Sequence, residues 1–402
     1  MNITILIGHL VKERHKLLYD FCLFLSENGF TISVVTGFPS RRISEQLIEY
    51  YKNLSLQKIN DNFLIYRVGS KKGEGKSLII RFIKYLFLSI EIIKKAKEIN
   101  NSKIIVFSTP PLLSLFALNL KNKSNKLYLY LQDIFPDSLF NLFPIFKFSP
   151  FYILRLIEKY TYNRFDKIIV ISENIRTTIL KRTNREVLTI YNWFDASLKY
   201  ISHRDNFLYN KFNIDKSNFN IVYGGDIGNF QNIKLILHSA KYLKSYPINF
   251  IFIGNGSYLD KAIKYKKSES LDNVIFIPFQ NKDFISSVYS LGDLQLLPLK
   301  KEMYRFALPS KFLNILACNS KILAIIEAES EVSSFINKFD LGFVFSEENP
   351  SLLSRFILSI YHDYFLPSKT SHQSSYSFKK NHYEFLSNFT ITYQVKKLID
   401  II

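Results

Sequence analysis

The C-terminal half of the chain alternates short apolar runs with amphipathic stretches of helical periodicity. Four runs rich in β-branched and aromatic residues predict strands at 219–223, 248–253, 273–278 and 294–299. Each run ends in a loop of Gly, Pro, Asn or Ser and is followed by a predicted helix. Buried strands that alternate with helices form a parallel sheet, whose strand ends and helix N-termini bind phosphate readily. We therefore expect this half to hold a nucleotide.

The N-terminal half shows the same alternation. Its predicted strands are 3–7, 31–36, 103–107, 126–131, 167–171 and 186–190. Its predicted helices are 12–28, 78–99, 112–120, 150–164 and one from Glu173 that Ser172 caps. Weaker periodicity in 192–217 indicates a hinge. The sequence thus predicts an α/β protein with an N-terminal domain over 1–200, a C-terminal domain over 201–375 and a final helical segment, 376–402.

The charge balance is strongly basic. The 53 Lys and Arg residues outnumber the 34 Asp and Glu residues, which gives a formal net charge of +19. Such a charge suits nucleic acid, an anionic membrane or a phosphorylated ligand. A compositional bias toward Lys, Asn, Ile, Phe and Tyr is the alternative explanation. Basic runs no longer than pairs such as Lys71-Lys72 and Lys379-Lys380, without a recognised binding motif, argue against nucleic acid.

Compartment and membrane signals favour a cytoplasmic protein that lies on a membrane. Residues 1–7 read as a strand rather than a signal peptide, and Cys22 and Cys318 lie in apolar helical contexts that imply no disulfide. The most apolar stretch, 78–97, is interrupted by charges and does not reach the roughly 20 apolar residues of a span. Its apolar side could rest on a membrane, as could 139–156; the alternative for both is a core helix. The apolar residues of the first stretch are Ile79, Ile80, Phe82, Ile83, Leu86, Phe87, Ile90 and Ile93.

A glycine-rich stretch at 69–77 looks like a phosphate-binding P-loop but fails on spacing. Five residues, not four, separate Gly69 from Gly75. The loop backbone must wrap the phosphates and place the lysine, so the spacing is essential. We interpret the stretch as a basic surface loop.

Motifs along nearly the whole chain resemble the family 4 retaining glycosyltransferases of bacterial polysaccharide assembly, in particular the fucosamine-type and colanic-acid branch. They are Glu13-Arg14, Ser108-Thr109-Pro110-Pro111, Gln132-Asp133-Ile134-Phe135-Pro136-Asp137-Ser138, Tyr191-Asn192-Trp193, Tyr223-Gly224-Gly225-Asp226-Ile227-Gly228, Gly254-Asn255-Gly256 and Pro309-Ser310-Lys311. The resemblance implies the GT-B fold, in which two Rossmann-like domains face a central cleft and the C-terminal helix returns to the N-terminal domain.

The resemblance also implies a hexosyltransferase reaction. A sugar, expected to be an N-acetylated deoxyhexosamine on UDP, would move with retention to a polyprenyl-diphosphate-linked saccharide in O-antigen, lipopolysaccharide or capsule assembly. The nucleotide-sugar is a substrate, and neither a cofactor nor a metal is implied. The protein would work at the inner face of the cytoplasmic membrane, where its basic charge suits anionic lipid.

The leaving diphosphate must be stabilised by positive charge and backbone N–H groups. Lys311 is the expected source of that charge, although a plain surface lysine is the alternative. The resemblance assigns donor binding to Gly225, Gly228, Gln231, Gly254, Gly256, Phe279, Ser310, Lys311 and Glu331. Simple turns at the glycines and an exposed helix-start carboxylate at Glu331 are the structural alternatives.

The acceptor is assigned to the N-terminal domain. Asp133 follows a predicted buried strand and is the candidate proton acceptor, with Ser138 within reach. An N-cap role is the alternative for Asp133. Arg14, at the start of the first predicted helix, would pair with a pyrophosphate. Asp133 and Lys311 are the two candidate catalytic residues.

Several positions depart from the family pattern. Asp226 and Gln231 stand where Arg and Lys are usual, and Phe306 and Asn314 replace the glutamates of the E-x7-E motif. A non-catalytic GT-B protein that binds or scaffolds within a polysaccharide assembly complex is therefore the alternative function. Donor hydrolysis would distinguish the enzyme from it.

Overall fold

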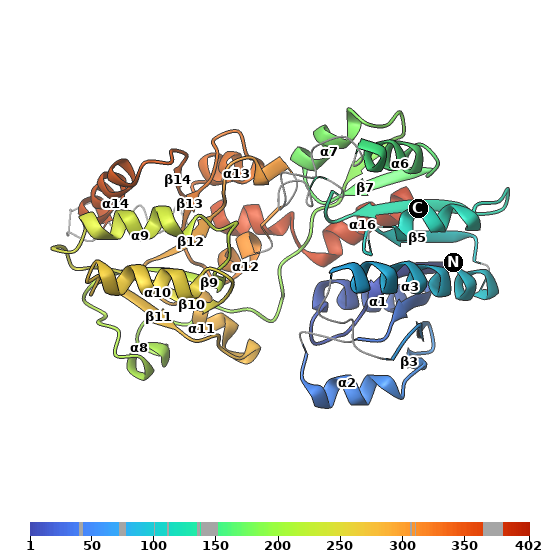
Figure 1. Ribbon diagram of the computed structural model, residues 1–402, viewed down its shortest axis with the longest axis horizontal. Coiled ribbons are helices and arrows are strands. Elements are labelled where there is room, and N and C mark those ends of the chain that lie inside the picture. The colour runs from blue at the N-terminus through green and yellow to red at the C-terminus, as the bar shows by residue number, and fades with distance from the viewer. Residues whose placement is uncertain are drawn as a thin grey trace. The chain divides into compact units, whose positions relative to one another are not determined.

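A computed structural model describes residues 1–39, 43–71, 78–99, 101–110, 112–134, 137, 152–305, 308–309, 311–364 and 381–402. The chain forms two compact units (Figure 1). The N-terminal unit comprises Met1–Asn192 and Ile391–Ile402, and the C-terminal unit comprises Trp193–Thr390. The chain thus changes unit after Asn192 and returns at Ile391, where the sequence analysis drew its divisions at 200 and 376.

The N-terminal unit contains an eight-stranded sheet in the order β3-β4-β2-β1-β5-β6-β7-β8. Its strands are β1 (Asn2–His9), β2 (Thr31–Gly37), β3 (Leu56–Asn60), β4 (Phe63–Val68), β5 (Lys103–Phe107), β6 (Lys126–Leu131), β7 (Lys167–Val170) and β8 (Val187–Thr189). Only the β3–β4 pair among these is antiparallel. The central strands are buried on both faces, as their unbroken apolar runs require.

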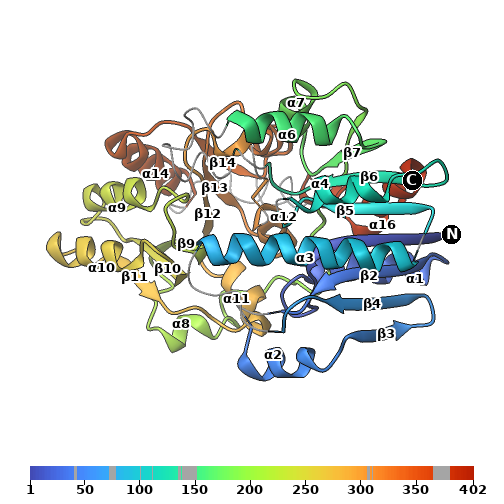
Figure 2. The same cartoon turned by 45° about the vertical axis from the view of Figure 1, so that its right-hand side comes forward.

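The described helices of this unit pack around the sheet. They are α1 (Lys16–Glu27), α2 (Glu45–Lys52), α3 (Leu78–Ile99), α4 (Leu113–Ala117) with the 3-10 turn η1 (Leu118–Leu120), α6 (Tyr152–Tyr162), α7 (Glu173–Leu180) and α16 (Ile391–Ile401). Figure 2 shows α3 along the front of the sheet, where it packs on β1 and β2. The predicted cap of α7 is confirmed, because Ser172 Oγ accepts a hydrogen bond from Ile175 N at 3.2 Å.

The C-terminal segment joins the N-terminal unit through α16. Gln394 is buried, and its Oε1 accepts a hydrogen bond from Tyr191 N at 3.0 Å. The Tyr128 hydroxyl donates to the backbone oxygen of Ile402 at 3.2 Å, and Lys103 Nζ bonds to the same oxygen. α16 also contacts α1. These contacts tie the last turn of the chain to strands formed early in the sequence.

Two parts of the N-terminal prediction were wrong. α2, β3 and β4 were not predicted. β3 has no apolar run, and the buried face of β4 ends in a charged residue, Arg67. The first helix begins at Lys16 rather than at residue 12. Residues 11–15 close a turn instead: His15 N donates to Val11 O at 2.7 Å, and Val11 N donates to His15 Nδ1 at 3.2 Å.

The C-terminal unit contains a six-stranded parallel sheet in the order β11-β10-β9-β12-β13-β14. The strands are β9 (Phe219–Asp226), β10 (Ile248–Asn255), β11 (Val274–Ile277), β12 (Leu294–Pro298), β13 (Ile322–Ile325) and β14 (Gly342–Phe345). The four predicted strands are confirmed as β9 to β12, and β13 and β14 extend the sheet.

Helices cover this sheet on both faces. They are α8 (Leu208–Lys211), α9 (Ile233–Tyr242), α10 (Leu259–Ser268), α11 (Ile285–Tyr289), α12 (Lys311–Ala317), α13 (Glu331–Phe339) and α14 (Pro350–Tyr364), with the 3-10 turns η4 (Lys282–Phe284) and η5 (Met303–Arg305). Figures 1 and 2 show α9 and α14 side by side, and both pack on a core that includes Phe219, Phe250 and Phe252. Burial of these aromatic rings stabilises the unit by about 2 to 3 kcal/mol each.

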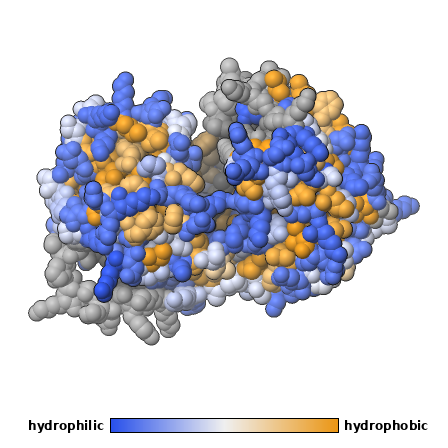
Figure 3. All heavy atoms as spheres, turned by 90° about the horizontal axis from the view of Figure 1, so that it is seen from below, coloured by the Kyte–Doolittle hydropathy of each residue, from blue (hydrophilic) through white to orange (hydrophobic). Residues whose placement is uncertain are grey.

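No helix among the described residues is long and apolar enough to cross a membrane. On the face drawn in Figure 3, apolar residues are interspersed with hydrophilic ones. The helix predicted at 78–99 is present as α3. Ile93 is buried at 6% exposure, against the prediction that it shares the apolar surface, because it faces the sheet side of α3 together with Ile92.

Candidate functional site

Just before their last residues, β9 and β10 carry paired glycines, Gly225 and Gly254, which form a strip of backbone without side chains. The two strands pair in parallel, with Gly225 opposite Gly254 and Asp226 opposite Asn255. Gly225 has φ +144° and Gly254 has φ +155°, conformations that only glycine adopts without strain. A Cβ on Gly254 would overlap the backbone oxygen of Gly225. The glycines are therefore required for the two strand ends to approach each other.

Lys311, the first residue of α12, lies against this strip. A Cβ on Gly225 would overlap Lys311 Nζ, so the ammonium group occupies the space above the Gly225 backbone. Its Nζ donates to the Tyr223 hydroxyl at 2.8 Å and lies 4.2 Å from the centre of the Tyr223 ring. Among the residues that the structure describes, no carboxylate oxygen lies within 4.0 Å of this nitrogen. Burial lowers the pKa of Lys311 to about 8, although the Asp226 carboxylate opposes the shift.

Tyr223 holds the lysine in place. Its side chain is 1% exposed, and its hydroxyl donates to the backbone oxygen of Asp226 at 2.6 Å. The hydroxyl oxygen also accepts a hydrogen bond from Lys311 Nζ. The tyrosine therefore fixes the ammonium group with one neutral acceptor and one ring face, and leaves its charge available to an anion.

The loop after β9 brings two further predicted residues to the same place. Gly228 N donates to Gln231 Oε1 at 3.2 Å, and a Cβ on Gly228 would overlap the Asp226 carboxylate. Gly256 packs equally closely on the backbone of Ile227. The structure thus gathers the predicted donor-binding residues Gly225, Gly228, Gln231, Gly254, Gly256 and Lys311 around one strand edge.

The other predicted donor-binding residues are placed differently. Phe279 follows β11, and its ring is 66% exposed. Glu331 is the first residue of α13, whose N-cap is Ser330: Ser330 Oγ accepts from Ser333 N at 3.1 Å. Asn314, which was not a predicted donor-binding residue but one of the two departures from the E-x7-E motif, accepts a hydrogen bond at Oδ1 from Asp195 N at 3.1 Å, near the start of the C-terminal unit. Ser310 and Phe306 lie outside the described residues.

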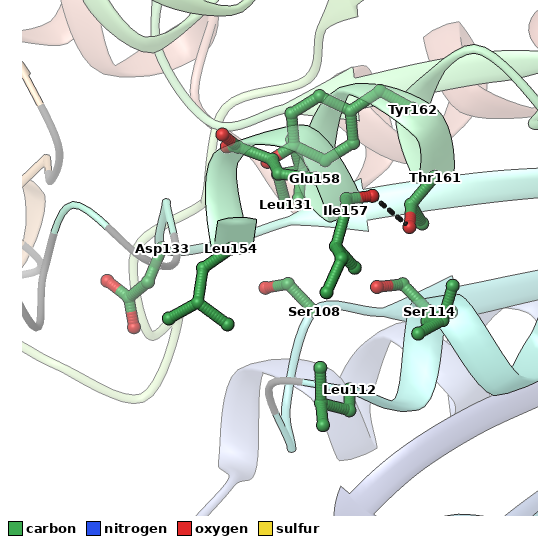
Figure 4. A pocket seen from close by; sticks show the side chains of 11 residues that line it. Ser108, Leu112, Ser114, Leu131, Asp133, Leu154, Ile157, Glu158, Thr161 and Tyr162 are labelled. Carbon is green, nitrogen blue, oxygen red and sulfur yellow. Dashed lines mark hydrogen bonds between the residues drawn. The ribbon is translucent and has the colours of Figure 1, made fainter. Parts of the chain in front are cut away.

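In the N-terminal unit, Asp133 follows β6 at one end of a small pocket of about 30 Å³ (Figure 4). The carboxyl group meets solvent, but the surrounding protein desolvates it and raises its pKa. The pocket is lined by Ser108, Leu112, Ser114, Leu115, Leu131, Asp133, Leu154, Ile157, Glu158, Thr161 and Tyr162. Ser138 lies outside the described residues.

Arg14 does not open the first helix. It lies in the turn between β1 and α1, where its backbone N donates to Val11 O at 3.1 Å. Arg14 is neither the N-cap nor in the first turn of α1, because the helix begins at Lys16. Its proposed pairing with a pyrophosphate stays a prediction.

A cluster of charges beside the Asp133 pocket was not predicted from the sequence. Arg182 Nη1 lies 2.5 Å from Asp137 Oδ2 and 3.0 Å from Glu158 Oε1, and Arg155 Nη2 lies 2.8 Å from Asp137 Oδ1. Both carboxylates are buried. Burial raises the pKa of Glu158, against the lowering effect of Arg182. The spacing of Arg155 and Glu158 on one helix was visible, but their partners come from other elements.

Parts of the chain are similar in sequence to known glycosyltransferases. Residues 205–381 match the family model described as Glycosyl transferases group 1. The chain is 24% identical over 284 residues to a probable glycosyltransferase, WbjE, of Pseudomonas aeruginosa, covering 69% of each protein. It is 25% identical over 178 residues to the putative colanic acid biosynthesis glycosyl transferase WcaI of Escherichia coli K12, covering 43% of this chain and 44% of WcaI.

Solved structures give the fold. Anabaena HepE, in complex with UDP and glucose, superposes with a TM-score of 0.71 at 14% identity, over 100% of this chain and 99% of HepE. The chain therefore has the GT-B fold, with two α/β sheets of mostly parallel strands. The family match over the C-terminal unit and the two relatives support a glycosyltransferase.

Removal of Arg182 tests the buried charge cluster. We expect Arg182→Met to lower the free energy of unfolding by about 3 to 5 kcal/mol at pH 7.5, because it leaves two buried carboxylates without their main counter-ion. The loss should be smaller at pH 5.5, because removal of Arg182 takes away the interaction that lowers the pKa of Glu158 and so favours the neutral carboxyl group as pH falls. Urea unfolding measures both values.

Lys94→Met is the matched control, since Lys94 forms an exposed pair with Glu91 at 3.0 Å. It should change the free energy of unfolding by less than about 0.5 kcal/mol. Equal effects of the two substitutions would contradict a structural role for the cluster.

Proposed function

We propose that this protein transfers a sugar, with retention of anomeric configuration, from a nucleoside diphosphate donor to a lipid-linked saccharide in bacterial polysaccharide assembly. The observation that carries the proposal is the Lys311 ammonium group, held over a side-chain-free backbone strip without a carboxylate partner. WcaI is named for colanic acid biosynthesis, and HepE binds UDP, which supports a polysaccharide product and a UDP-sugar donor.

The chemistry follows from the charge that develops as the donor bond breaks. The leaving diphosphate gains negative charge, and the Lys311 ammonium group would neutralise part of it. Gly225 leaves room for the Lys311 ammonium group, and backbone N–H groups of the loop around Gly228 would donate hydrogen bonds to the diphosphate. Retention means that the acceptor oxygen bonds to the face of the sugar that the diphosphate leaves. Phe279 and Glu331 are assigned to the nucleoside and the donor sugar.

Asp133 is the proposed acceptor-side group. Its raised pKa brings the carboxylate closer to the working pH, which suits a proton acceptor for the attacking hydroxyl. The donor sugar, an N-acetylated deoxyhexosamine of the fucosamine type, is proposed from the sequence resemblance.

The acceptor lipid would be reached at an anionic membrane surface, on its cytoplasmic side. α3 exposes a stripe of apolar side chains, Ile80, Ile83, Phe87 and Ile90, of which Phe87 is 65% exposed. α6 exposes Ile153, Leu156 and Tyr160 in a second stripe. Exposed apolar stripes beside lysines suit insertion into the headgroup region.

A transfer assay tests the enzyme. Membranes that carry lipid-linked oligosaccharide would be incubated with a panel of UDP-sugars and GDP-sugars, and the anomeric configuration of the product read by NMR. We expect Lys311→Met and Asp133→Asn each to lower kcat about 100-fold or more, because each removes a group that acts in the transition state.

The exposed Lys338 on α13 offers a matched control, and Lys338→Met should retain full transfer. UDP binding without hydrolysis or transfer from any donor would instead indicate the non-catalytic binding protein.

The pH dependence of UDP binding tests the state of Lys311. Affinity should be highest below pH 8 and fall as pH rises through about 8, because the amine loses the proton that attracts the diphosphate. Lys311→Arg should keep its charge and remove this fall. Tyr223→Phe removes an acceptor of the ammonium N–H and should move the fall to lower pH. Isothermal titration calorimetry between pH 6.5 and 10 measures it, and a flat wild-type profile would contradict the assignment.

Vesicle binding tests the membrane proposal. Phe87→Ser should weaken binding to phosphatidylglycerol vesicles about tenfold, since a buried aromatic ring contributes roughly 1.5 kcal/mol or more. Tyr242→Ser removes a similarly exposed ring, at 59%, from α9 in the C-terminal unit and should leave binding unchanged. Co-sedimentation measures both, and equal binding by wild type and Phe87→Ser would overturn the role of α3.

A further inference from the structure

A second polar pocket lies in the N-terminal unit, around the β3–β4 hairpin that the sequence did not reveal. It has a volume of about 230 Å³. The β1–α1 turn, α1, α2, β3 and β4 all contribute to it. Its lining residues are Leu10, Lys12, Glu13, Tyr19, Tyr50, Tyr51, Gln57, Ile65 and Arg67.

Arg67 places a buried positive charge in the wall of this pocket. The side chain is 4% exposed, and its guanidinium group lies 4.6 Å from the centre of the Tyr51 ring. Nη2 donates to Gln57 Oε1 at 2.8 Å and Nη1 donates to Leu54 O at 3.4 Å, which uses two of its five N–H groups. Nε is enclosed and has no hydrogen-bond partner.

The charge of Arg67 is not neutralised by a salt bridge. Within the described part of the chain, no carboxylate oxygen lies within 4.0 Å of the guanidinium nitrogens. Desolvation lowers the pKa of Arg67, yet a guanidinium stays protonated in proteins. The Glu13 carboxylate acts on Arg67 only from beyond this distance, so burial of the guanidinium group remains costly, and an anion that enters the pocket would reduce that cost. Arg182, in the same unit, differs because its charge is balanced by the carboxylates of Asp137 and Glu158.

The other charged groups leave the pocket with an excess of positive charge. Lys12 stands at the rim, with Nζ 5.5 Å from the centre of the Tyr19 ring. Glu13 is the acidic residue of the lining, and its Oε2 accepts a hydrogen bond from the Tyr51 hydroxyl at 2.9 Å. Two cations therefore face one carboxylate.

We propose that this pocket binds an anionic group carried on a sugar ring. The volume suits a single monosaccharide unit, and the lining offers hydroxyl, amide and charged groups to its hydroxyls. The Tyr50 ring is 56% exposed and presents an apolar face for the ring of the sugar. Arg67 and Lys12 bind the carboxylate or phosphate of that sugar. That the sugar belongs to the acceptor glycan rests on the proposed function; binding of an anionic sugar in the pocket does not.

Calorimetry with the full chain tests the site. Glucuronate and glucose 6-phosphate represent the two sources of negative charge, and glucose is the neutral probe. We expect at least one anionic sugar to bind about tenfold or more tightly than glucose, with affinity falling as salt rises from 50 to about 500 mM. The stronger of the two identifies the anionic group.

Two lysines provide a matched pair of variants. Lys12→Gln should weaken binding of the anionic sugar about threefold to tenfold, because an exposed charge contributes on the order of 1 kcal/mol. Lys58 follows Gln57 on β3, is exposed and does not line the pocket, so Lys58→Gln should change the affinity less than about twofold.

Arg67→Lys keeps the positive charge but replaces the planar guanidinium group, with its paired N–H donors, by an ammonium group. It should weaken binding about tenfold in protein whose thermal unfolding shows an intact fold, because a lysine cannot form the bidentate contact. If this variant does not fold, the two lysine variants still decide the question.

Equal binding of glucose and both anionic sugars, or no binding of either anion at about 20 mM, overturns the proposal. So does an equal loss in Lys12→Gln and Lys58→Gln. None of these readouts involves transfer or a nucleotide, so failure of the pocket and failure of the proposed reaction are separate results.

Discussion

The geometry of the candidate donor site depends on how Lys311 is held. An ammonium group that is largely removed from water normally has a carboxylate beside it, since the charge is otherwise costly. Here its hydrogen-bond partner is the Tyr223 hydroxyl, and its neighbour is the bare backbone of Gly225. This desolvation lowers the pKa of Lys311, and a bound anion would stabilise the charged form of the amine. The glycines at 225 and 254 serve the same arrangement, because any side chain there would displace the lysine or separate the strands.

Three enclosed cations, Arg182, Lys311 and Arg67, differ in the partners that surround them. Arg182 is buried beside Asp137 and Glu158 at hydrogen-bond distance, and its charge is fully used within the fold. Lys311 and Arg67 are enclosed by aromatic rings and neutral acceptors instead. The first kind of cation stabilises the structure, whereas the second keeps an electrostatic potential available for a ligand. Each unit therefore contains an enclosed cation with no carboxylate oxygen of the described residues within 4.0 Å, and each is proposed to bind an anion.

Two residues that depart from the motifs of the glycosyltransferases this sequence resembles make identifiable contacts in the structure. Asn314, in place of a glutamate, holds the backbone of Asp195. Asp226 replaces a usual arginine, and its carboxylate lies beside Gly228 and opposes the pKa shift of Lys311. With an aspartate where a cation is usual, more of the diphosphate charge would fall on Lys311. This dependence explains why one lysine substitution is expected to have so large an effect.

Local sequence determined most of the regular elements. The helix Leu78–Ile99 and the strands Lys103–Phe107 and Lys126–Leu131 were predicted to the residue, because apolar periodicity and flanking breakers are properties of neighbouring positions. The glycines and Lys311 could be named from motifs. Their geometry could not, since Lys311 meets Tyr223 across 88 residues, and Glu13 meets Tyr51 across 38. The β3–β4 hairpin was missed because its inward face carries Arg67, whose burial depends on Tyr51 and Gln57 from other elements. Contacts between distant residues decide which charges are compensated, and only the tertiary structure contains them.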